Sequence, residues 1–547
     1  MMPELLDNGR RQLLFWVFLL VCGEGLAAGA GAVATRGLFN ALHSQATLAT
    51  DLMVLLALSG LVIAACRVAS RTRGEQMGQA YALEIRQALF HQGTFMSVSD
   101  VSARRTGYMS LRFVGDLTAF KNWLGLGLPR LLAALVLIPL TLFVLGWMHT
   151  PFLVVVAPLY FTALLIIGLG GMKLPRLQRR VRSRRAAIAA DMAERMPIAP
   201  ALGQLGRRRN ESNRITRRSR RLITAALERI TQAEWLKSVP DMISGFAALG
   251  VIWIGSRDGI DTGTIAGGLA ALGIALKPMR DLATVWDYWS SFQAAHRKCV
   301  AALERTRRRS SAGGKTLRPG PLKIKFRQLS LPPVNGLNGS IRAGARVLLT
   351  GDNGTGKSRL LRALNGLDKP DSGSITLGGR PIETLSQGTL RRCVWRISHD
   401  VPILSGSLRK ALTMGLDQRP GDEELMAVAA AAGLASTLAA LTGLDGKIAE
   451  GGRNLSEGER VKIALTRAML ADPGMILVDA CAGQLDTQGE QALRNLLGTS
   501  RATIIVVNGA GITDLTFDQI LDLDCTQLFR QSAAAAATHE LPSVSYG

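Results

Sequence analysis

The chain has 547 residues, of which 48% are apolar and only 5% aromatic, and its mean hydropathy is +0.19. This length predicts at least two domains. The formal net charge is +24, and 16 of the Lys and Arg residues lie between Lys173 and Arg221. Such a basic run is typical of nucleic-acid binding or of the cytoplasmic side of a membrane protein. The long apolar segments on either side favour the membrane and exclude a nucleic-acid partner.

Six apolar segments in the N-terminal half predict membrane-spanning helices, which need about 20 residues each. The first segment exceeds the apolar length of a signal peptide, so it predicts a retained span. Short connections follow spans one, three and five, whereas long basic connections follow spans two and four. The positive-inside rule therefore places the long connections and both termini in the cytoplasm. The predicted spans are residues 13–35, 51–66, 131–147, 152–170, 239–255 and 263–280.

The long connections show helical periodicity over residues 74–96 and 181–235. We therefore expect the membrane helices to continue into the cytoplasm and return. The predicted fold class is multi-domain: an all-α six-helix transmembrane domain with long cytoplasmic extensions, followed by an α/β nucleotide-binding domain. Its predicted parts are a transmembrane domain at 1–305, a basic linker at 306–321, a nucleotide-binding domain at 322–530 and a disordered tail at 531–547.

Two charged residues fall within predicted spans, where a charge is costly. They are Glu24 in the first span and Lys277 in the sixth. One interpretation is a polar contact with a transported substrate, or a pair that lines a cavity. The other is a structural salt bridge, with Lys277 extending toward the inner interface. The sequence leaves both interpretations open.

The strongest motif follows the apolar run Val347–Thr350 and leads into an amphipathic helix that begins near Arg359. It matches the pattern G-x-x-x-x-G-K-[ST] at every fixed position. A strand, glycine loop and helix in this order place backbone N–H groups around a phosphate chain. We expect Lys357 to reach the β- and γ-phosphates and Ser358 to bind Mg²⁺. The predicted ATP-binding residues are Gly351, Asp352, Asn353, Gly354, Thr355, Gly356, Lys357 and Ser358.

A second motif is the apolar run Met475–Val478, which ends in Asp479. It predicts a buried strand that delivers a carboxylate at its C-terminal end. Carboxylate and hydroxyl oxygens are ligands that Mg²⁺ accepts. Asp479 and Ser358 are therefore the predicted metal ligands, and ATP and Mg²⁺ are the predicted cofactors.

Further along the chain, Glu450-Gly451-Gly452 precedes the segment Leu455–Glu459, and Gln484-Leu485-Asp486 follows Asp479. With the glycine loop, these segments resemble the ATPase domain of ABC transporters. From about residue 10 to 525 the chain resembles a half-transporter of the ABC exporter type. The resemblance implies a dimer in which one subunit's glycine loop and the other subunit's signature sandwich ATP, and in which short coupling helices rest on the ATPase domains. The implied signature residues are Leu455, Ser456, Glu457, Gly458 and Glu459, and the implied D-loop residue is Asp486.

The departures from the family pattern concern hydrolysis. The family places a glutamate after the Walker B aspartate, a switch histidine after a later strand and a glutamine in the Q-loop. Here these positions hold Ala480, Asn508 and His399. A general base typically contributes about 10²–10⁴-fold to a rate. No catalytic residue is therefore intact at this site, which is expected to bind ATP and hydrolyse it poorly, and enzymatic activity stays open.

Three functions remain open from the sequence. The favoured one is the hydrolysis-deficient half of a heterodimeric exporter, which supplies its signature to a working partner site. The alternatives are a slow homodimeric exporter and a non-transporting, ATP-sensing membrane protein. The expected location is a multi-pass position in the lipid bilayer, with a bacterial inner membrane favoured and the ATPase domain in the cytoplasm. The sequence does not identify the substrate.

Overall fold

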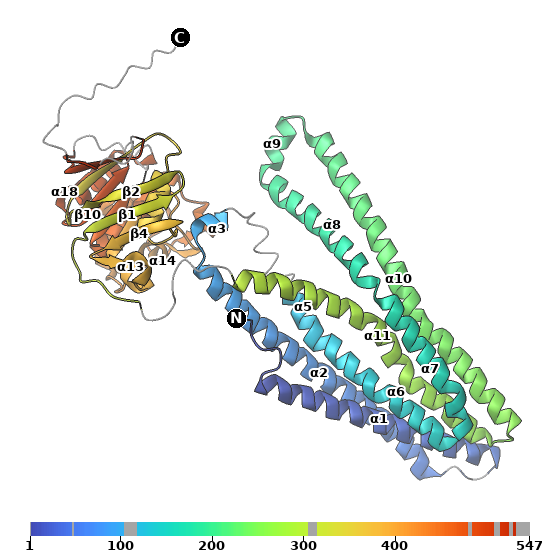
Figure 1. Ribbon diagram of the computed structural model, residues 1–547. Coiled ribbons are helices and arrows are strands. Elements are labelled where there is room, and N and C mark those ends of the chain that lie inside the picture. Colours follow the sequence, from blue (N-terminus) through green and yellow to red (C-terminus); the bar gives the residue numbers. More distant parts are fainter. Residues whose placement is uncertain are drawn as a thin grey trace. The chain divides into compact units, whose positions relative to one another are not determined.

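The computed structural model describes residues 2–45, 47, 49–102, 117–304, 314–479, 484–507, 515–524 and 529–531. The chain forms two compact units (Figure 1). The first comprises residues 1–94 and 102–305, and the second comprises residues 95–101 and 306–547. Half of the predicted linker, residues 306–313, and nearly all of the predicted tail lie outside the described residues.

The first unit is built from long helices that lie side by side (Figure 1). The predicted spans and their predicted extensions merge into single helices, because apolar and polar residues both continue the same hydrogen-bonded backbone. The helix α2 thus runs through residues 51–66 and 74–94 without a break. The elements are α1 (Asn8–His43), α2 (Thr50–Thr94), α5 (Leu117–Asn122), the π-helical turn η2 (Trp123–Gly127), α6 (Leu128–Met148), α7 (Thr150–Gly171), α8 (Leu174–Arg195), α9 (Ala199–Gln204), α10 (Arg208–Arg257) and α11 (Thr262–Leu303).

Within the described residues, five helical segments are long and apolar enough to cross a membrane. The sixth predicted span lies within α11, which is not one of the five. Its apolar stretch is diluted by glycines and interrupted by Lys277 and Pro278. The sixth span therefore stays a prediction. The five segments are Gly9–His43, Thr50–Thr94, Leu117–Met148, Thr150–Gln204 and Arg208–Arg257.

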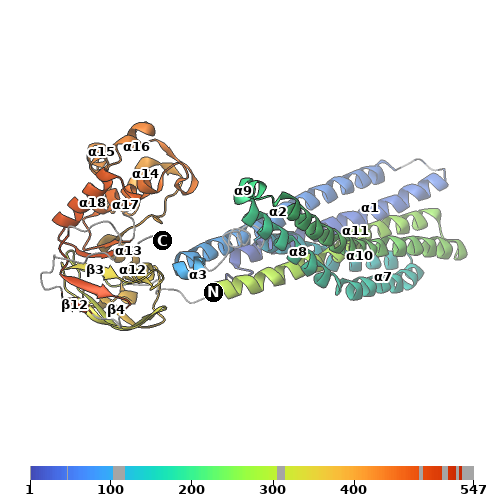
Figure 2. The same ribbon diagram turned by 90° about the horizontal axis from the view of Figure 1, so that it is seen from above.

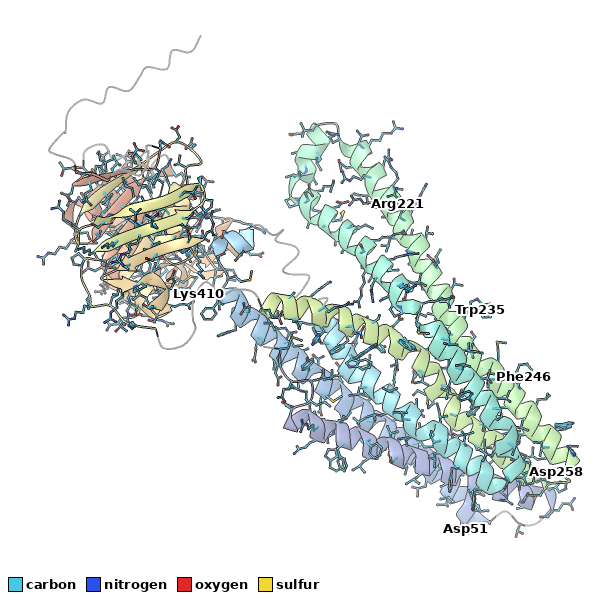
Figure 3. All side chains as sticks on the ribbon, viewed as in Figure 1. Asp51, Arg221, Trp235, Phe246, Asp258 and Lys410 are labelled. Carbon is cyan, nitrogen blue, oxygen red and sulfur yellow. The ribbon has the colours of Figure 1, made fainter. Side chains whose placement is uncertain are left out.

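The outer face of α10 shows where the apolar surface lies (Figure 3). Trp235 is 66% exposed and Phe246 is 59% exposed. Arg221 lies before this apolar belt, and Asp258 lies at the opposite end of the helix (Figure 3). At about 1.5 Å per residue, Trp235 and Asp258 are about 35 Å apart along the helix, close to the thickness of the bilayer core. Exposed apolar side chains over this length indicate a lipid-facing surface.

The second unit contains a six-stranded sheet with the strand order β12-β11-β3-β10-β9-β6. All of its neighbouring strands are parallel except β12, which runs antiparallel to β11. The central strands β9 and β10 are buried at every residue, as expected for parallel strands covered on both faces. The strands are β3 (Arg346–Thr350), β6 (Val394–Ile397), β9 (Met475–Val478), β10 (Thr503–Val507), β11 (Gln519–Asp522) and β12 (Phe529–Gln531).

A four-stranded antiparallel sheet and a group of helices complete the second unit (Figure 2). One apolar core joins the antiparallel sheet to β3 and α12, and another holds α14, α15 and α17 together. The described fold thus confirms the predicted α/β nucleotide-binding domain. The remaining principal elements are β1 (Ile324–Leu331), β2 (Val334–Ile341), β4 (Ser372–Leu377), β5 (Arg380–Pro381), β7 (Gly406–Ser407), β8 (Lys447–Ile448), α12 (Lys357–Leu364), α13 (Gln387–Cys393), α14 (Leu408–Thr413), α15 (Asp422–Ala431), α16 (Ala435–Ala440), α17 (Glu457–Ala471) and α18 (Thr487–Thr499).

A short segment from the first predicted cytoplasmic connection belongs to the second unit. Residues 95–101 include the start of α3 (Val98–Ser102). The Val98 N–H donates to the Leu367 carbonyl oxygen at 3.1 Å, and the Ser99 N–H donates to the buried Asp368 carboxylate at 3.0 Å. Arg362 holds Asp368 from the other side at 3.0 Å. Such docking is what the family resemblance implied for a coupling helix.

Candidate functional site

The glycine loop connects β3 to α12 and has the backbone of a phosphate-binding loop. Gly351, Gly354 and Gly356 have φ values of +139°, +93° and +98°. Side-chain-bearing residues rarely adopt this region, so these positions favour glycine. A Cβ on Gly356 would lie 3.1 Å from Val334 Cγ2, which leaves little room. The loop therefore turns its backbone into the start of α12, where N–H groups attract phosphate.

Lys357 lies over this loop. Its Nζ donates to the Asp352 carbonyl oxygen at 2.7 Å and also to the Gly351 carbonyl oxygen. The ammonium group is thereby held inside the loop, where a phosphate chain would be bound. This position fits the predicted contact with the β- and γ-phosphates.

The two predicted magnesium ligands lie together. Ser358 Oγ donates to Asp479 Oδ1 at 3.0 Å, although the residues are 121 positions apart. Asp479 follows β9 and is 6% exposed, and its N–H donates to the Ile397 carbonyl oxygen at 3.0 Å. The parallel ladder of β6 and β9 thus positions the carboxylate at the carboxyl edge of the sheet. A hydroxyl and a carboxylate oxygen side by side are a donor set that fits Mg²⁺.

Arg396 is a component of this site that the sequence analysis missed. Its side chain is only 7% exposed, and Nη1 lies 3.4 Å from Asp479 Oδ2. Its Nη2 binds Asp400 at 2.7 Å. Burial by itself raises the pKa of Asp400, but hydrogen bonds from Ser398 and Arg396 outweigh it and lower that pKa overall. The available signal was an arginine inside the apolar strand β6.

The signature segment forms the start of α17. Ser456 caps the helix, and its backbone N–H and Oγ both donate to Glu459 Oε2 at 2.8 and 2.9 Å. Thr437 donates to the other Glu459 oxygen at 2.6 Å. Burial raises the pKa of Glu459, but these hydrogen bonds outweigh it and lower the pKa. Glu459, which stands where the family has glutamine, is therefore half of a capping box.

Two further contacts explain residues around the signature. A Cβ on Gly458 would lie 2.4 Å from the Gln484 carbonyl oxygen, so only glycine fits there. Asp486 caps α18 by accepting from the Gly489 N–H at 2.9 Å. The buried Lys462 of α17 binds the same carboxylate at 2.7 Å and is the main cause of its lowered pKa. The predicted D-loop residue is thus tied to the signature helix.

Of the three positions predicted to weaken hydrolysis, one lies among the described residues. His399 is exposed in a turn after β6. Ala480 and Asn508 lie outside the described residues. The effect of these substitutions on hydrolysis therefore stays a prediction from the sequence.

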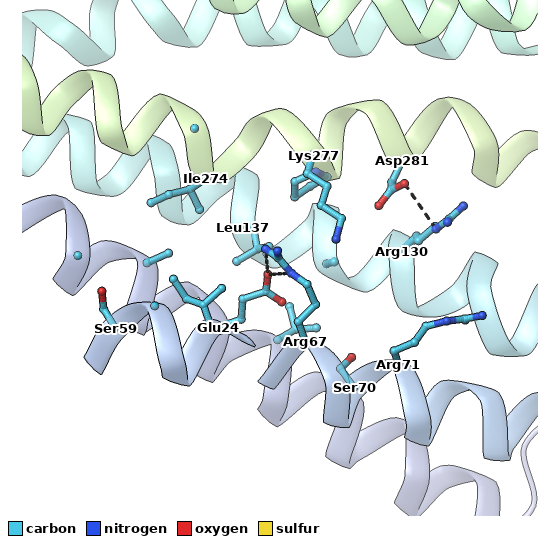
Figure 4. Close-up of a pocket in the computed structure, with 18 of the residues that line it drawn as sticks. Glu24, Ser59, Arg67, Ser70, Arg71, Arg130, Leu137, Ile274, Lys277 and Asp281 are labelled. Atoms are coloured by element: carbon cyan, nitrogen blue, oxygen red, sulfur yellow. Dashed lines mark hydrogen bonds and ion pairs between the residues drawn. The ribbon is translucent and has the colours of Figure 1, made fainter. Parts of the chain in front are cut away.

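Glu24 and Lys277 line one cavity of about 560 Å³ in the first unit (Figure 4). Glu24 does not pair with Lys277, however. Glu24 Oε1 binds Nη2 of Arg67 at 2.7 Å and its Nε at 3.0 Å. Among the described residues no ion pair joins Lys277 to a carboxylate. The interpretation of Glu24 and Lys277 as a structural salt bridge is therefore corrected to a Glu24–Arg67 ion pair, because α2 continues beyond residue 66 and brings Arg67 beside α1.

The sequence analysis also missed four charged residues that line the cavity. The predicted spans exclude these side chains, because Arg67, Arg71 and Asp281 lie one to five residues beyond the end of a span and Arg130 lies directly before the start of one. The spacing of four residues, one helical turn, between Arg67 and Arg71 and between Lys277 and Asp281 was the available signal. The four missed residues are Arg67, Arg71, Arg130 and Asp281.

Comparison with known families gives two matches. Residues 13–263 match the family described as ABC transporter transmembrane region. Residues 334–482 match the family described as ABC transporter. The matches fall in the helical unit and in the unit that holds the glycine loop, and together they cover most of the chain.

Curated relatives share this arrangement at low identity. The chain is 23% identical over 451 residues to an ATP-dependent lipid A-core flippase of Desulfotalea psychrophila, which covers 79% of this chain and 78% of that protein. It is 26% identical over 461 residues to the human antigen peptide transporter 2, which covers 78% of this chain and 64% of that protein. These two relatives are named for different substrates.

Among solved structures, the chain resembles that of a bacterial Atm1-family ABC exporter with ATP bound. The TM-score is 0.80 at 20% sequence identity, and the match covers 95% of this chain and 94% of the other. At this identity the likeness establishes the fold.

Proposed function

From the chain's membership of the ABC transporter family we infer that it is the hydrolysis-deficient half of a heterodimeric exporter. The chain is an integral membrane half-transporter of exporter architecture, and it binds ATP. In this role it couples ATP binding, and hydrolysis at the partner's site, to substrate efflux. ABC half-transporters function as dimers, and the substituted catalytic positions favour a different half-transporter as the partner.

One observation carries this proposal. Lys357 donates to a carbonyl oxygen of the glycine loop, and Ser358 donates to Asp479, which supports a site for a phosphate chain and its metal. The next residue, which should polarise the attacking water, is Ala480. A methyl group cannot accept a proton, so this site retains its binding groups and lacks its general base.

Magnesium is proposed as the cofactor of this site. Ser358 Oγ and one oxygen of Asp479 would hold it, because they already lie within hydrogen-bonding distance of each other. The metal would neutralise charge on the β- and γ-phosphates and fix their orientation. Lys357 would bind the same phosphates from the glycine loop.

The signature is proposed to act on the partner's ATP. Ser456 and the backbone N–H groups at the start of α17 would bind the partner-bound γ-phosphate, as a helix N-terminus binds an anion. Glu459 adds a carboxylate to this end of the helix, but both of its oxygens accept hydrogen bonds from Ser456 and Thr437. Leu455 is buried and anchors the segment.

We place the half-transporter in a bacterial inner membrane, with the ATPase unit and both termini in the cytoplasm. The sequence supports this through the positive residues of the long connections. The names of the relatives do not agree on a cargo, so the substrate must be argued from this chain's own residues.

The test is co-purification of the tagged chain from its native membrane. We expect a second half-transporter with an intact glutamate after its Walker B aspartate, and ATP hydrolysis by the complex that the partner's Glu→Gln variant abolishes. A preparation that contains this chain alone and hydrolyses ATP would contradict the heterodimer and favour the homodimeric exporter.

A further inference from the structure

The cavity that holds Glu24 and Lys277 is formed by four elements of the first unit. Its walls come from α1, α2, α11 and the segment made of η2 and α6. Its volume of about 560 Å³ lies within the range of pockets that hold a small organic ligand. Its lining residues all belong to the first unit.

The two ends of the cavity differ in chemistry (Figure 4). Leu137 and Ile274 lie toward one end, together with Ser59. Arg71, Arg130 and Asp281 lie toward the other end. On α2 and α11, the charged lining residues lie closer than most of the apolar ones to the helix end that extends beyond the predicted span. A ligand that fills the cavity would therefore meet an apolar wall at one end and charges at the other.

Positive charge exceeds negative charge among the described lining residues. Four cations, Arg67, Arg71, Arg130 and Lys277, face two carboxylates, Glu24 and Asp281. Glu24 binds Arg67 at 2.7 Å, and Asp281 lies 3.5 Å from Arg130. Each carboxylate of the cavity is thus matched to one arginine. Arg71 and Lys277 remain without a carboxylate of the cavity.

The partners of Arg71 leave part of its charge unbalanced. Its Nη1 donates to the Gly125 carbonyl oxygen at 2.9 Å, and its Nη2 lies 3.6 Å from Glu75. Glu75 binds Lys121 more closely, at 2.7 Å. Gly125 belongs to the π-helical turn η2, and such turns occur frequently at functional sites. A Cβ on Gly74 would lie 2.8 Å from the Gly125 oxygen, so glycine lets α2 approach this turn.

An uncompensated charge at membrane depth is costly unless it faces water or a partner. We propose that the cavity binds an amphiphile with an anionic headgroup, a phosphate or carboxylate held by Lys277 and Arg71, and that its hydrocarbon part lies along Leu137 and Ile274. This inference rests on the proposed exporter function and names the substrate class of its membrane domain.

The test uses the full-length protein in nanodiscs of zwitterionic phosphatidylcholine, with binding to empty nanodiscs subtracted. The probes are tritiated decyl phosphate and tritiated decyltrimethylammonium, which share a chain and differ in the sign of the headgroup. We expect saturable binding of decyl phosphate and binding of decyltrimethylammonium at least about tenfold weaker, because the cations of the cavity donate hydrogen bonds to an anionic headgroup and repel a cationic one. Equal affinity for the two probes would overturn the inference.

Variants locate the site. Lys277→Met keeps a side chain of similar length without the charge and is expected to weaken decyl phosphate binding about tenfold. Lys277→Arg should keep the wild-type affinity for decyl phosphate. This result would show that the loss in Lys277→Met comes from the missing charge and not from misfolding. Lys173→Met, at an exposed cation outside the cavity, is the matched control and should change nothing. Wild-type affinity in Lys277→Met would contradict the inference.

Two further measurements distinguish an amphiphile from a soluble anion, and the proposed substrate class from the proposed ATP-binding function. Inorganic phosphate should compete only at concentrations far above those of decyl phosphate, and equal competition would show that the site takes a soluble anion and not an amphiphile. Binding of a fluorescent ATP analogue is measured in the same preparations. If the analogue binds and decyl phosphate does not, the substrate class is wrong while the proposed ATP-binding function stands.

A second inference comes independently from Arg396. Its guanidinium, which stays charged at every physiological pH, lies 3.4 Å from Asp479, the carboxylate proposed to hold Mg²⁺. Ser358 already donates to the other oxygen of Asp479. Arg396 also binds Asp400 at 2.7 Å, so its charge is shared between two carboxylates. We propose that Arg396 offsets part of the negative charge of Asp479, so that this site, which takes Mg²⁺ as its proposed cofactor, still binds ATP when Mg²⁺ is removed.

The measurement is the affinity of a fluorescent ATP analogue for the full-length protein, in excess EDTA and in excess Mg²⁺. The wild type should differ little between the two conditions. In Arg396→Leu, loss of the charge should weaken binding about tenfold in EDTA, and Mg²⁺ should restore much of it. Arg396→Lys should behave as the wild type, and so should Arg391→Leu, which removes an exposed arginine that pairs with Asp417 on the surface. Loss of wild-type binding in EDTA would contradict the inference.

Discussion

In the glycine loop, the Lys357 ammonium group donates to the carbonyl oxygens of Gly351 and Asp352. We expect Lys357→Ala to weaken ATP binding by this chain at least about a hundredfold, because it removes the charge that faces the β- and γ-phosphates. Photolabelling with an azido-ATP analogue in detergent measures this. Arg359→Ala, two residues further along α12, is the control and should keep most of the labelling. Unchanged labelling of Lys357→Ala would show that the loop does not bind phosphate.

The substituted catalytic positions lead to a second expectation for single residues. Ala480→Glu alone should raise hydrolysis little, because Asn508 and His399 still replace the residues that hold the water and the γ-phosphate. Ala480→Glu, Asn508→His and His399→Gln together should exceed the sum of the single gains, since residues that act as a unit are not additive. The assay needs the assembled pair with the partner's own glutamate removed. Full activity from Ala480→Glu alone would show that one residue had been lost and that the other two suffice.

At the scale of the helix, α17 connects the signature to the ATPase core through its capping box. The pKa of Glu459 is lowered in the folded protein, because hydrogen bonds from Thr437 and Ser456 outweigh the effect of burial. A carboxyl group with a lowered pKa stabilises the fold above its unfolded pKa of about 4.3, and the stabilisation is lost as the pH falls through the folded value.

Thermal unfolding of the full chain in detergent between pH 7 and pH 3.5 measures this contribution. Glu459→Ala should cost about 0.5–2 kcal/mol at pH 7, as the loss of a cap does. Glu459→Gln should keep most of the cap, since glutamine also completes a capping box, and should lose stability less steeply below pH 5 than the wild type. An identical pH dependence in Glu459→Gln and wild type would contradict this role of the carboxylate.

The pair of helices α1 and α2 carries the corrected ion pair. Glu24 is 12% exposed and Arg67 is 50% exposed, so solvent screens the pair in part. Glu24→Gln and Arg67→Met should each lower the unfolding free energy by about 1–2 kcal/mol, and the double variant should lose less than their sum. Thermal unfolding of the wild type, the two single variants and the double variant measures the coupling between the two side chains. Additive losses would show that the two side chains do not interact.

Helices and strands with a strong pattern could be predicted from the sequence. The buried strand before Asp479 and the glycine loop before Lys357 lie where their motifs placed them, because a run of four apolar residues and a fixed turn leave little choice. Arg396 and Arg67 could not be assigned to sites in this way. Arg396 lies in an apolar strand, and Arg67 lies just beyond the end of a predicted span. The partner of each comes from a distant part of the sequence.

For the whole molecule, the two units carry separate parts of the proposed mechanism. The ATPase unit holds the glycine loop, the proposed metal site and the proposed signature, and Ser99 of the segment 95–101 binds Asp368 of this unit. The helical unit holds a charged cavity among helices able to cross a membrane. The proposed efflux requires that ATP binding in one unit alter the other.

The most direct test of the central claim compares ATP binding and ATP hydrolysis by the purified chain alone, reconstituted in lipid, in the wild type and in Lys357→Ala. We predict that the wild type binds ATP and that Lys357→Ala does not. We also predict that both hydrolyse ATP at the same background rate, because the binding groups are present and the general base is not. A wild-type ATPase rate well above background that Lys357→Ala abolishes would contradict the account, since this site would then be catalytically competent.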